Sequence, residues 1–346
     1  MAVQEVILET NPALPVPYSE KAVLKALTDC YLIADTKKDG VQLNLVVEGI
    51  AGQPLFLSRA GKVLPAIQKA SDMALLGCYA LLQDDSCIYP EGFMLQAEIV
   101  TPGQPAEITA GNLRRTKGAP FDLGSIEVHV FGVVPLDVIE SGADHDVTHS
   151  VMKYHVEAMV ALLQKHVPIL KWSAVESLDV FNPEELQRTY EARREAGEEG
   201  LVLKDPNAIW RRGKKVGQWK MKPEDTIDGK VVGLVWGTPG LANEGKVIGF
   251  EVLLEDGHVV NACGLTQEQK DQFTQWVVYH SRLAYGEENF PTDANGGLSD
   301  DLQGEVVNYY EGWAVEVAFM ERFKDGSLRH PSFSRWRGIS DPMTKE

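Results

Sequence analysis

The sequence lacks the features that mark secreted, membrane-spanning or zinc-bound proteins. It has only four cysteines in 346 residues, and no two of them form a Cys-x-x-Cys pair. Dispersed cysteines in a chain of this length are typical of free thiols in a reducing compartment and argue against a zinc site. No apolar run approaches the roughly 20 residues that a membrane-spanning helix needs. The first residues include no basic segment followed by an apolar one, so we expect no secretory signal and a cytoplasmic location.

Positive charge is also scarce. The chain has 33 lysines and arginines against 50 acidic residues, which gives a net charge of -17 and a pI near 5.0. This balance excludes a histone-like coat of positive charge, but it does not exclude a local basic surface that binds a polyanion. With 44% hydrophobic and 24% charged residues, the composition is that of a soluble globular protein long enough for two domains. The sequence has no internal repeat and no low-complexity segment.

The first two thirds of the chain mix helices and strands without a regular alternation. Apolar spacing and capping residues predict helices over 17–30, 62–76, 149–166 and 182–197. Alternating or apolar runs predict strands at 41–45, 55–58 and 93–95. Because the strands do not alternate with helices in a βαβ pattern, we predict an α+β fold with a mostly antiparallel sheet.

The pattern changes after Pro223. A polar linker at 224–229 precedes short strands at 231–236, 247–254, 259–262 and 313–319. One helix over 266–278 is inserted among them, opened by a capping box of Thr266 and Gln269. Residues 286–304 read as a polar, mobile loop. Several short strands with one inserted helix predict an OB-fold β-barrel. We therefore predict one domain at 1–228 and an OB-fold domain at 229–346.

Lysines and a basic run indicate phosphate chemistry. Lys37 lies where an apolar strand runs into a turn at Gly40, and a lysine there is a nucleophile when a neighbouring cation lowers its pKa. Lys220 and Lys222 alternate on one strand, so both face the same side, where an anion between them relieves their repulsion. In an acidic chain, the basic run from Glu199 to Pro223 indicates a polyanionic partner. From the residues alone, two plainer alternatives remain. Lys37 could lie in an ordinary charged turn, and Lys220 and Lys222 could lie on a solvent-exposed strand face.

Two acids and one aromatic complete the candidate set. Glu98 and Glu199 lie at strand ends, and their carboxylates are ligands that a divalent cation favours. Phe131 is an aromatic that can stack on a base. The plainer alternatives are two solvated surface acids and a core aromatic.

In their order and spacing these residues resemble the ATP-dependent DNA ligases, most closely the small two-domain ligases of short-tailed bacteriophages. The resemblance covers nearly the whole chain. It is strongest from Glu199 to Glu255 and returns from Asp325 to Gly338. It implies an adenylation domain of the covalent nucleotidyltransferase superfamily, followed by an OB-fold domain.

The resemblance also implies a role for each matched position. Lys37 is the adenylated nucleophile, and Asp39 and Gly40 shape its turn. The other matched positions are Asp35 and Phe131 against adenine, Ser58 and Arg59 as nucleotide or DNA-phosphate contacts, Glu98 at the ribose or metal site, Glu199 at the metal, Lys220 and Lys222 on the α-phosphate, and Arg329 and Arg337 on the pyrophosphate leaving group. A duplex-binding surface comprises Arg114, Arg115, Lys117, Arg211, Arg212, Lys214 and Lys215.

The chain departs from the family pattern at three places. Gln42 stands where an arginine is usual, and that arginine would make a bidentate phosphate or ribose contact. Gln96 and Ala97 replace the Asp-Gly that usually precedes the acid at Glu98. Lys38 replaces a common aromatic and can supply some of the missing charge. The nucleophile, both acids and both lysines are retained, so we expect an active enzyme.

The implied activity is the sealing of 5′-phosphate/3′-hydroxyl nicks in duplex DNA, with ATP and Mg²⁺, through a lysine–AMP intermediate. Such an enzyme serves DNA replication, repair and recombination. We expect a monomer with nicked duplex DNA as its partner, located in the host cytoplasm if phage-encoded. The alternatives are an RNA ligase or an mRNA-capping guanylyltransferase of the same superfamily, which differ in nick substrate or nucleotide, and a non-catalytic DNA-binding relative of the ligases.

Overall fold

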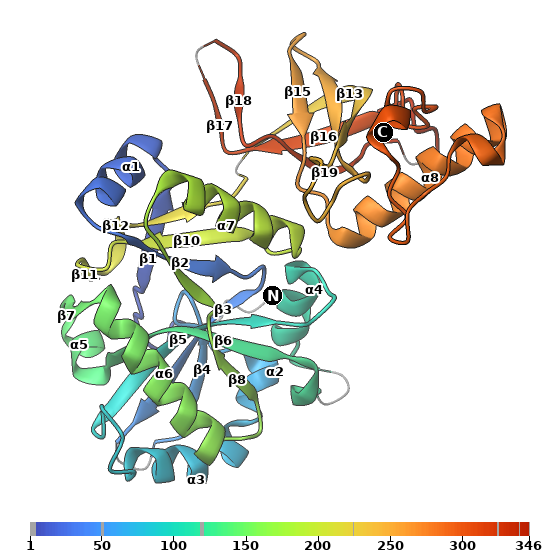
Figure 1. Cartoon of the computed structure of the whole chain (residues 1–346). Coiled ribbons are helices and arrows are strands. Elements are labelled where there is room, and N and C mark those ends of the chain that lie inside the picture. Colours follow the sequence, from blue (N-terminus) through green and yellow to red (C-terminus); the bar gives the residue numbers. More distant parts are fainter. Residues whose placement is uncertain are drawn as a thin grey trace. The chain divides into compact units, whose positions relative to one another are not determined.

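The computed structural model describes residues 5–49, 52–117, 121–223, 225–323, 325–338 and 340–345. Its contacts divide the chain into two compact units. The first unit comprises Met1–Leu186 and Leu201–Lys220, and the second comprises Gln187–Gly200 and Met221–Glu346. Figure 1 shows the chain coloured from the N-terminus to the C-terminus. None of the described helices is long and apolar enough to cross a bilayer.

Two five-stranded sheets organise the N-terminal part of the chain (Figure 1). The first has the order β4-β3-β5-β6-β8, antiparallel except for the parallel pair β6 and β8. The second has the order β1-β12-β10-β2-β9, in which β1 and β12 are parallel and β2 and β9 antiparallel. The strands are β1 (Ala13–Pro17), β2 (Leu32–Lys37), β3 (Val41–Glu48), β4 (Leu55–Ser58), β5 (Gly92–Val100), β6 (Glu127–Pro135), β8 (Lys171–Ala174), β9 (Ser177–Val180), β10 (Gly200–Lys204) and β12 (Gly213–Met221), with β7 (His145–Thr148) and β11 (Ile209–Trp210) forming a separate antiparallel pair.

Helices cover the sheets and close the core. The predicted helix over 149–166 is confirmed as α6 (His149–His166), which packs along β6 and β8. Its Met152, Val156, Met159 and Leu163 are buried at helical spacing. The other described helices before residue 200 are α1 (Glu20–Asp29), α2 (Pro65–Gln68), α3 (Ser71–Leu82), α4 (Ala106–Leu113), η1 (Leu123–Ser125), α5 (Leu136–Ser141) and α7 (Pro183–Glu195).

The C-terminal sheet has five antiparallel strands in the order β15-β14-β13-β16-β19. They are β13 (Asp225–Trp236), β14 (Val247–Leu254), β15 (Val259–Ala262), β16 (Ala314–Phe319) and β19 (Ser332–Trp336), with β17 (Glu321–Arg322) and β18 (Leu328–Arg329) as a separate pair. The chain segments at the two edges meet at a single parallel bridge, Cys263 to Ser332. Among the described residues the sheet is therefore not a closed barrel, because the short β15 and β19 do not pair along their length.

The inserted helix α8 (Gln267–Tyr285) begins with the predicted capping box. The hydroxyl of Thr266 accepts from the backbone N–H of Gln269, and the side chain of Gln269 accepts from the backbone N–H of Thr266. One core lies between this helix and the sheet, and its aromatic rings pack around Phe250 with Phe273, Tyr310 and Trp336 as neighbours.

Several boundaries differ from the sequence prediction. The predicted helix over 62–76 is two helices, α2 and α3, separated at Lys69 and Ala70. The predicted loop over 286–304 contains the short helices η2 (Glu287–Asn289) and α9 (Asp300–Gln303). The predicted linker starts at Glu224, which lies outside the described residues, and its remainder belongs to β13. Those residues are extended because Asp225–Gly229 pair with β16.

Candidate active site

The turn that carries Lys37 lies against strand β5. Lys37 is the last residue of β2, and three residues separate it from the start of β3. A Cβ atom on Gly40 would come within 2.3 Å of the carbonyl oxygen of Ile99 and 3.0 Å of the side chain of Glu98. Because no real side chain tolerates such an approach, glycine at position 40 lets the turn rest on β5. The turn that follows the half-buried Lys37 is thereby held against the strand that carries Glu98.

Glu98 faces the position where the family arginine is missing. In the sheet register, Glu98 on β5 pairs with Gln42 on β3 and with His129 on β6. The amide of Gln42 donates to Asn44 Oδ1 at 3.3 Å, and Asn44 donates to the carbonyl oxygen of Ser58 at 3.2 Å. Gln42 thus continues a polar row from β5 to the end of β4, but it adds no charge beside Glu98.

A β-bulge presents Phe131. Val130 pairs with Ala97 and Gly132 pairs with Gln96, so Phe131 is the extra residue on β6. A bulge of this kind re-aims a side chain away from the regular alternation of the strand. Phe131 lines a cavity of about 100 Å³ between the strands and α6. It is half-buried, which leaves its ring accessible to a ligand in that cavity.

The same cavity contains Asp35, the other predicted adenine contact. The Asp35 carboxylate lies 2.6 Å from the ammonium nitrogen of Lys204, and the Lys204 nitrogen also donates to the carbonyl oxygen of Phe131 at 3.4 Å. Lys204, at the end of β10, therefore links the two residues that sequence reasoning assigned to adenine. The further lining residues are Ile33, His149, Met152, Lys153, Val156, Glu157, Ala174, Val175 and Ser177.

His149 also lines this cavity, and its imidazole ring is neutral. It is the first residue of α6, and it is 4% exposed. Burial, with a smaller contribution from the charge of Lys204, lowers the pKa of His149 to about 3. The imidazole is therefore uncharged at neutral pH, with one nitrogen that donates and one that accepts.

Glu199 and Lys222 form an ion pair. Gly200, which follows Glu199 and is the first residue of β10, lets the two chain segments come close together. A Cβ on Gly200 would come within 2.1 Å of the carbonyl oxygen of Met221, so the two chain segments touch at that point. Lys220 lies within β12 and Lys222 directly follows it. Trp219 and Met221 are buried while the two lysines are half-buried, so the lysines alternate with side chains of the core.

The replacement of Asp-Gly by Gln96 and Ala97 has a structural reason. Gln96 is 1% exposed, and its side-chain oxygen accepts a hydrogen bond from the indole N–H of Trp210 at 2.7 Å. A Cβ on Gly132 would lie 3.1 Å from the same oxygen. Gln96 therefore ties β5 to β11 and supports the bulge at Phe131, while leaving Glu98 in place.

The predicted DNA-binding residues separate into two groups. The side chains of Arg114, Arg115, Lys117, Arg211, Lys214 and Lys215 are exposed. In contrast, the guanidinium group of Arg212 donates to four backbone carbonyl oxygens, those of Thr10, Val138, Ile139 and Ala143, at 2.7–3.3 Å. Burial also lowers the pKa of Arg212. Arg212 therefore ties α5 and the segment that follows it to the backbone at Thr10, and these contacts do not favour its inclusion in the duplex-binding surface.

The remaining predicted residues are three arginines: Arg59 follows strand β4, and Arg329 and Arg337 lie in the C-terminal domain. Arg59 is exposed after β4, and its carbonyl oxygen accepts from the hydroxyl of Thr10 at 2.8 Å. The guanidinium carbon of Arg329 lies 6.0 Å from the ring centre of Phe323. Arg337 pairs with Asp228 at 3.1 Å and with Glu316 at 3.5 Å. These ion pairs give Arg337 a structural contact within its own sheet.

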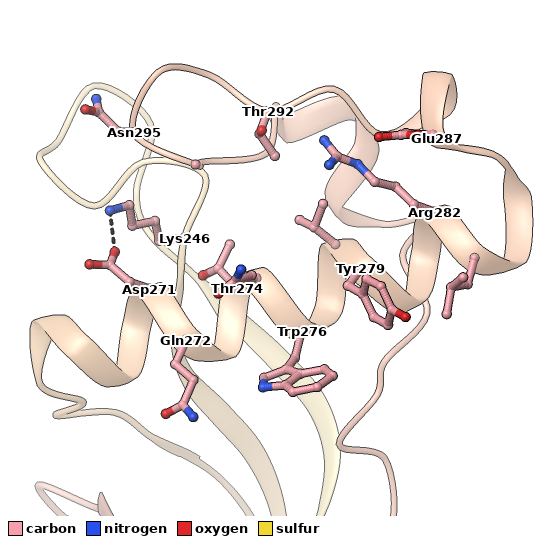
Figure 2. Close-up of a pocket in the computed structure, with 14 residues that line it drawn as sticks. Lys246, Asp271, Gln272, Thr274, Trp276, Tyr279, Arg282, Glu287, Thr292 and Asn295 are labelled. Carbon is pink, nitrogen blue, oxygen red and sulfur yellow. Dashed lines mark hydrogen bonds and ion pairs between the residues drawn. The ribbon is translucent and has the colours of Figure 1, made fainter.

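Sequence reasoning missed Lys204 and His149. Lys204 ends the apolar run Gly200–Leu203, and a lysine at the end of a buried strand was the available signal. His149 had none, because it opens an ordinary amphipathic helix. A hollow of about 940 Å³ along α8 in the C-terminal domain contains none of the predicted residues. Figure 2 shows it lined by Trp276, Tyr279 and the Lys246–Asp271 pair.

Comparison with known proteins fits this geometry. Residues 12–222 match the model of the ATP dependent DNA ligase domain, and residues 223–337 match the DNA ligase C-terminal domain. The chain is 41% identical to the DNA ligase of Escherichia phage T7 over 96% of its own length and 98% of that protein. It is 40% identical to the DNA ligase of Enterobacteria phage T3, covering 97% and 98% of the two chains.

Solved structures give the same result. The ATP-dependent DNA ligase from bacteriophage T7 in complex with ATP superposes with a TM-score of 0.82 at 40% identity, covering 95% of this chain and 99% of that one. A Chlorella virus DNA ligase-adenylate, at 19% identity, 96% and 100% coverage and a TM-score of 0.56, shares the fold. From its family domains and its near-full-length relatives, the chain belongs to the ATP-dependent DNA ligases.

Proposed function

We propose that this ATP-dependent DNA ligase seals 5′-phosphate/3′-hydroxyl nicks through a covalent intermediate on Lys37. The observation that carries the assignment is the approach of Gly40 to Ile99, which holds the turn after Lys37 against the strand of Glu98. Lys37 and Asp35 lie two residues apart on β2 and share one face, so the nucleophile and the cavity with Phe131 belong to the same side of the strand.

The reaction consists of three phosphoryl transfers. The Lys37 amine attacks the α-phosphorus of ATP, a P–N bond forms, and the bond to the β-phosphate oxygen breaks to release pyrophosphate. A 5′-phosphate oxygen of the nick then attacks the same phosphorus and breaks the P–N bond. Finally the 3′-hydroxyl attacks the 5′-phosphate, and AMP leaves. Lys220 and Lys222 stabilise the charge that builds on the phosphate oxygens.

Magnesium fits the residues that are present. Among the described residues no group of three or more His, Cys, Asp or Glu side chains could hold a metal. Mg²⁺ commonly binds through only one or two carboxylates together with substrate phosphates and water, so Glu98 and Glu199 would supply the protein ligands. The bound ion would neutralise charge on the phosphates during transfer.

We also propose where the DNA duplex binds and how the chain is divided into domains. The duplex lies along the exposed Arg114, Arg115, Lys117, Arg211, Lys214 and Lys215, and Arg329 orients the pyrophosphate. The protein acts as a monomer in the cytoplasm of the host cell. The adenylation domain covers 1–228 and the OB-type domain 229–346, a division supported by the family matches that meet between residues 222 and 223.

Transfer of label from α-labelled ATP to the protein tests the assignment. Lys37→Ala should carry no label after denaturing electrophoresis, while the neighbouring Lys38→Ala should retain it. Both variants should melt at the wild-type temperature, because both side chains lie at a turn. Full labelling of Lys37→Ala would overturn the assignment, and an unlabelled wild-type protein that still binds nicked DNA would favour the non-catalytic alternative.

A further inference from the structure

Helix α8 carries apolar side chains on its exposed face as well as on its buried face. Phe273 and Val277 belong to the core of the C-terminal sheet, whereas Trp276, Tyr279 and Leu283 are 43%, 50% and 65% exposed. These three residues are spaced three and four apart, so they form one stripe along the helix. A surface helix ordinarily presents polar residues on that side, and a contiguous apolar patch at a protein surface marks an interaction site.

The stripe lines the hollow of about 940 Å³, and the loop that carries Thr292 and Asn295 lines it as well (Figure 2). Binding sites commonly have volumes of about 300–1,000 Å³, so the hollow is large enough to receive several side chains of a partner. The ring of Trp276 stacks on that of Tyr309, with centroids 5.7 Å apart and an angle of 17° between the ring planes. An aromatic ring that is already ordered loses little conformational entropy when a partner covers it.

The accessible charge in the hollow is negative. The ammonium group of Lys246 is bonded to the carboxylate of Asp271 at 2.5 Å, and the side chain of Lys246 is only 11% exposed. The guanidinium group of Arg282 donates two hydrogen bonds to the carbonyl oxygen of Phe290. In contrast, the side chain of Asp271 is 52% exposed, and Glu287 is exposed. Both cations are therefore engaged within the protein, while the acids remain available to a partner.

The surroundings of the hollow have the same sign. Residues 266–305, which include α8 and the loop after it, contain eight acidic residues, all of them exposed, against two basic ones. One of these two, Lys270, is buried. Such a surface repels a polyanion such as DNA and attracts a cationic partner. The spacing of the exposed stripe is the one at which an amphipathic helix packs its apolar side chains into a groove. Charge and spacing together select a basic amphipathic helix.

We propose that the hollow along α8 is a docking site for a basic amphipathic helix of a partner protein. Trp276, Tyr279 and Leu283 contact the apolar side chains of that helix, and the exposed acids around them, Asp271 and Glu287 included, pair with its lysines and arginines. The docking site takes no part in phosphoryl transfer, so this proposal goes beyond the proposed function and does not depend on it.

The probe is a fluorescein-labelled helical peptide of leucine and lysine that has all its leucines on one face. Fluorescence anisotropy at physiological salt measures its binding to the full chain. The wild-type protein should bind this peptide more tightly than a scrambled peptide of the same composition, and more tightly than the matching peptide of leucine and glutamate. Trp276→Ser and Leu283→Ser should each weaken binding by about tenfold or more, because large apolar anchors carry most of the affinity of such an interface. Both variants should seal nicks at the wild-type rate.

Leu76→Ser is the matched control for the apolar changes, since Leu76 is exposed on helix α3 and does not line the hollow. This variant should bind the peptide as the wild type does. Glu287→Lys should weaken binding of the leucine–lysine peptide, whereas Glu107→Lys, which makes the same change of charge at an exposed position on α4, should not. Because Leu283 is largely exposed, Leu283→Ser covers the case in which Trp276→Ser does not fold.

Equal binding of the scrambled peptide would overturn the proposal, and so would unchanged binding in the folded Trp276→Ser and Leu283→Ser variants. A wild-type dimer in sedimentation that Leu283→Ser converts to a monomer would also overturn it, because a second copy of the chain would then cover the stripe. Loss of nick sealing in folded Leu283→Ser would assign this face to the DNA substrate instead of to a protein partner.

Discussion

The carboxylate of Asp35 and the ammonium group of Lys204 lie 2.6 Å apart, with side-chain exposures of 8% and 10%. The pair joins β2, which ends at the candidate nucleophile, to β10, which begins beside Glu199. This buried ion pair holds the two strands together, but it stabilises the fold only while both side chains are charged. Removing one partner leaves the other charge buried without compensation.

Asp35→Asn and Lys204→Met should each lower the free energy of unfolding by roughly 3–5 kcal/mol. The double variant should lose less than the sum of the two, because it buries no uncompensated charge. Urea denaturation of the wild type, both single variants and the double variant measures the coupling. Additive losses would contradict a direct interaction between the two side chains.

Lys153 and Asp179 provide the matched control. They are 3.8 Å apart and 36% and 40% exposed. Exposed pairs contribute about 0–1 kcal/mol, so Lys153→Met should leave the free energy of unfolding within that range of the wild-type value.

Local patterns predicted the elements better than their junctions. The spacing of Met152, Val156 and Met159 predicted α6, and the capping box predicted the start of α8. The extension of β13 to Asp225 was not predictable, because it depends on pairing with the distant strand β16. Propensity and periodicity describe neighbours in sequence, whereas a strand end is fixed by its partner strand.

In the candidate site, too, local sequence predicted some features, whereas others depend on residues that are distant in the chain. The chemistry was predicted because the order and spacing of Lys37, Glu98, Glu199 and the lysine pair resemble those of the ATP-dependent DNA ligases. The roles of Lys204 and Gln96 were not accessible, because each follows from a partner far away in the chain: Asp35 for Lys204 and Trp210 for Gln96. The contacts of Arg212 with backbone carbonyls were likewise not predictable from the basic run, because their acceptors lie far away in the chain.

His149 should make the stability of the protein depend on pH. Its folded-state pKa of about 3 lies below the ordinary value of 6.5, so the unfolded chain binds the additional proton between these values. The stabilisation by the neutral ring is complete above pH 6.5 and is lost as the pH falls. At about 1.4 kcal/mol per pH unit, the loss reaches about 2 kcal/mol at pH 5.

The measurement compares the wild type with His149→Phe, which has no titrating group at this position. The difference in the free energy of unfolding between the wild type and His149→Phe should be constant from pH 7 to 8. As the pH falls to 5, the wild type should lose stability relative to the variant. The other titratable groups on the cavity (Asp35, Lys204, Lys153 and Glu157) are common to both proteins, so the difference isolates the imidazole. If the free energies of unfolding of the two proteins changed with pH in the same way, His149 would be solvated in the folded protein.

Two neighbouring parts of the basic run should behave differently. Arg211→Ser, Lys214→Ser and Lys215→Ser together should reduce the slope of log K against log salt for nicked duplex DNA by up to about 0.9 for each phosphate that the protein no longer neutralises. Arg212→Ser should instead lower the free energy of unfolding by about 2 kcal/mol, because several carbonyl oxygens, most of them partly buried, lose a charged donor. Fluorescence anisotropy and urea denaturation distinguish the outcomes. An Arg212→Ser protein of wild-type stability with a flattened salt slope would place Arg212 on the DNA.

The last prediction separates the two arginines near the C-terminus by reaction step. Pyrophosphate leaves only in the first transfer, so a residue that orients it should be dispensable for sealing a nick that already carries AMP. Arg329 is expected to behave in this way: Arg329→Ala should lose self-adenylation and retain sealing of the pre-adenylated nick. Arg337 differs, because its guanidinium group pairs with Asp228 and Glu316.

Arg337→Ala should therefore lower Tm by about 2–4 °C and reduce both activities together. Arg335→Ala is the matched control, since Arg335 also contacts Glu316 but is 64% exposed, and its loss should change neither activity nor Tm. Rates of self-adenylation and of sealing, with the melting temperature, are measured for each variant. If Arg337→Ala kept its Tm and lost only self-adenylation, the arginine would act on the leaving group, and its ion pairs with Asp228 and Glu316 would have to open before ATP reacts.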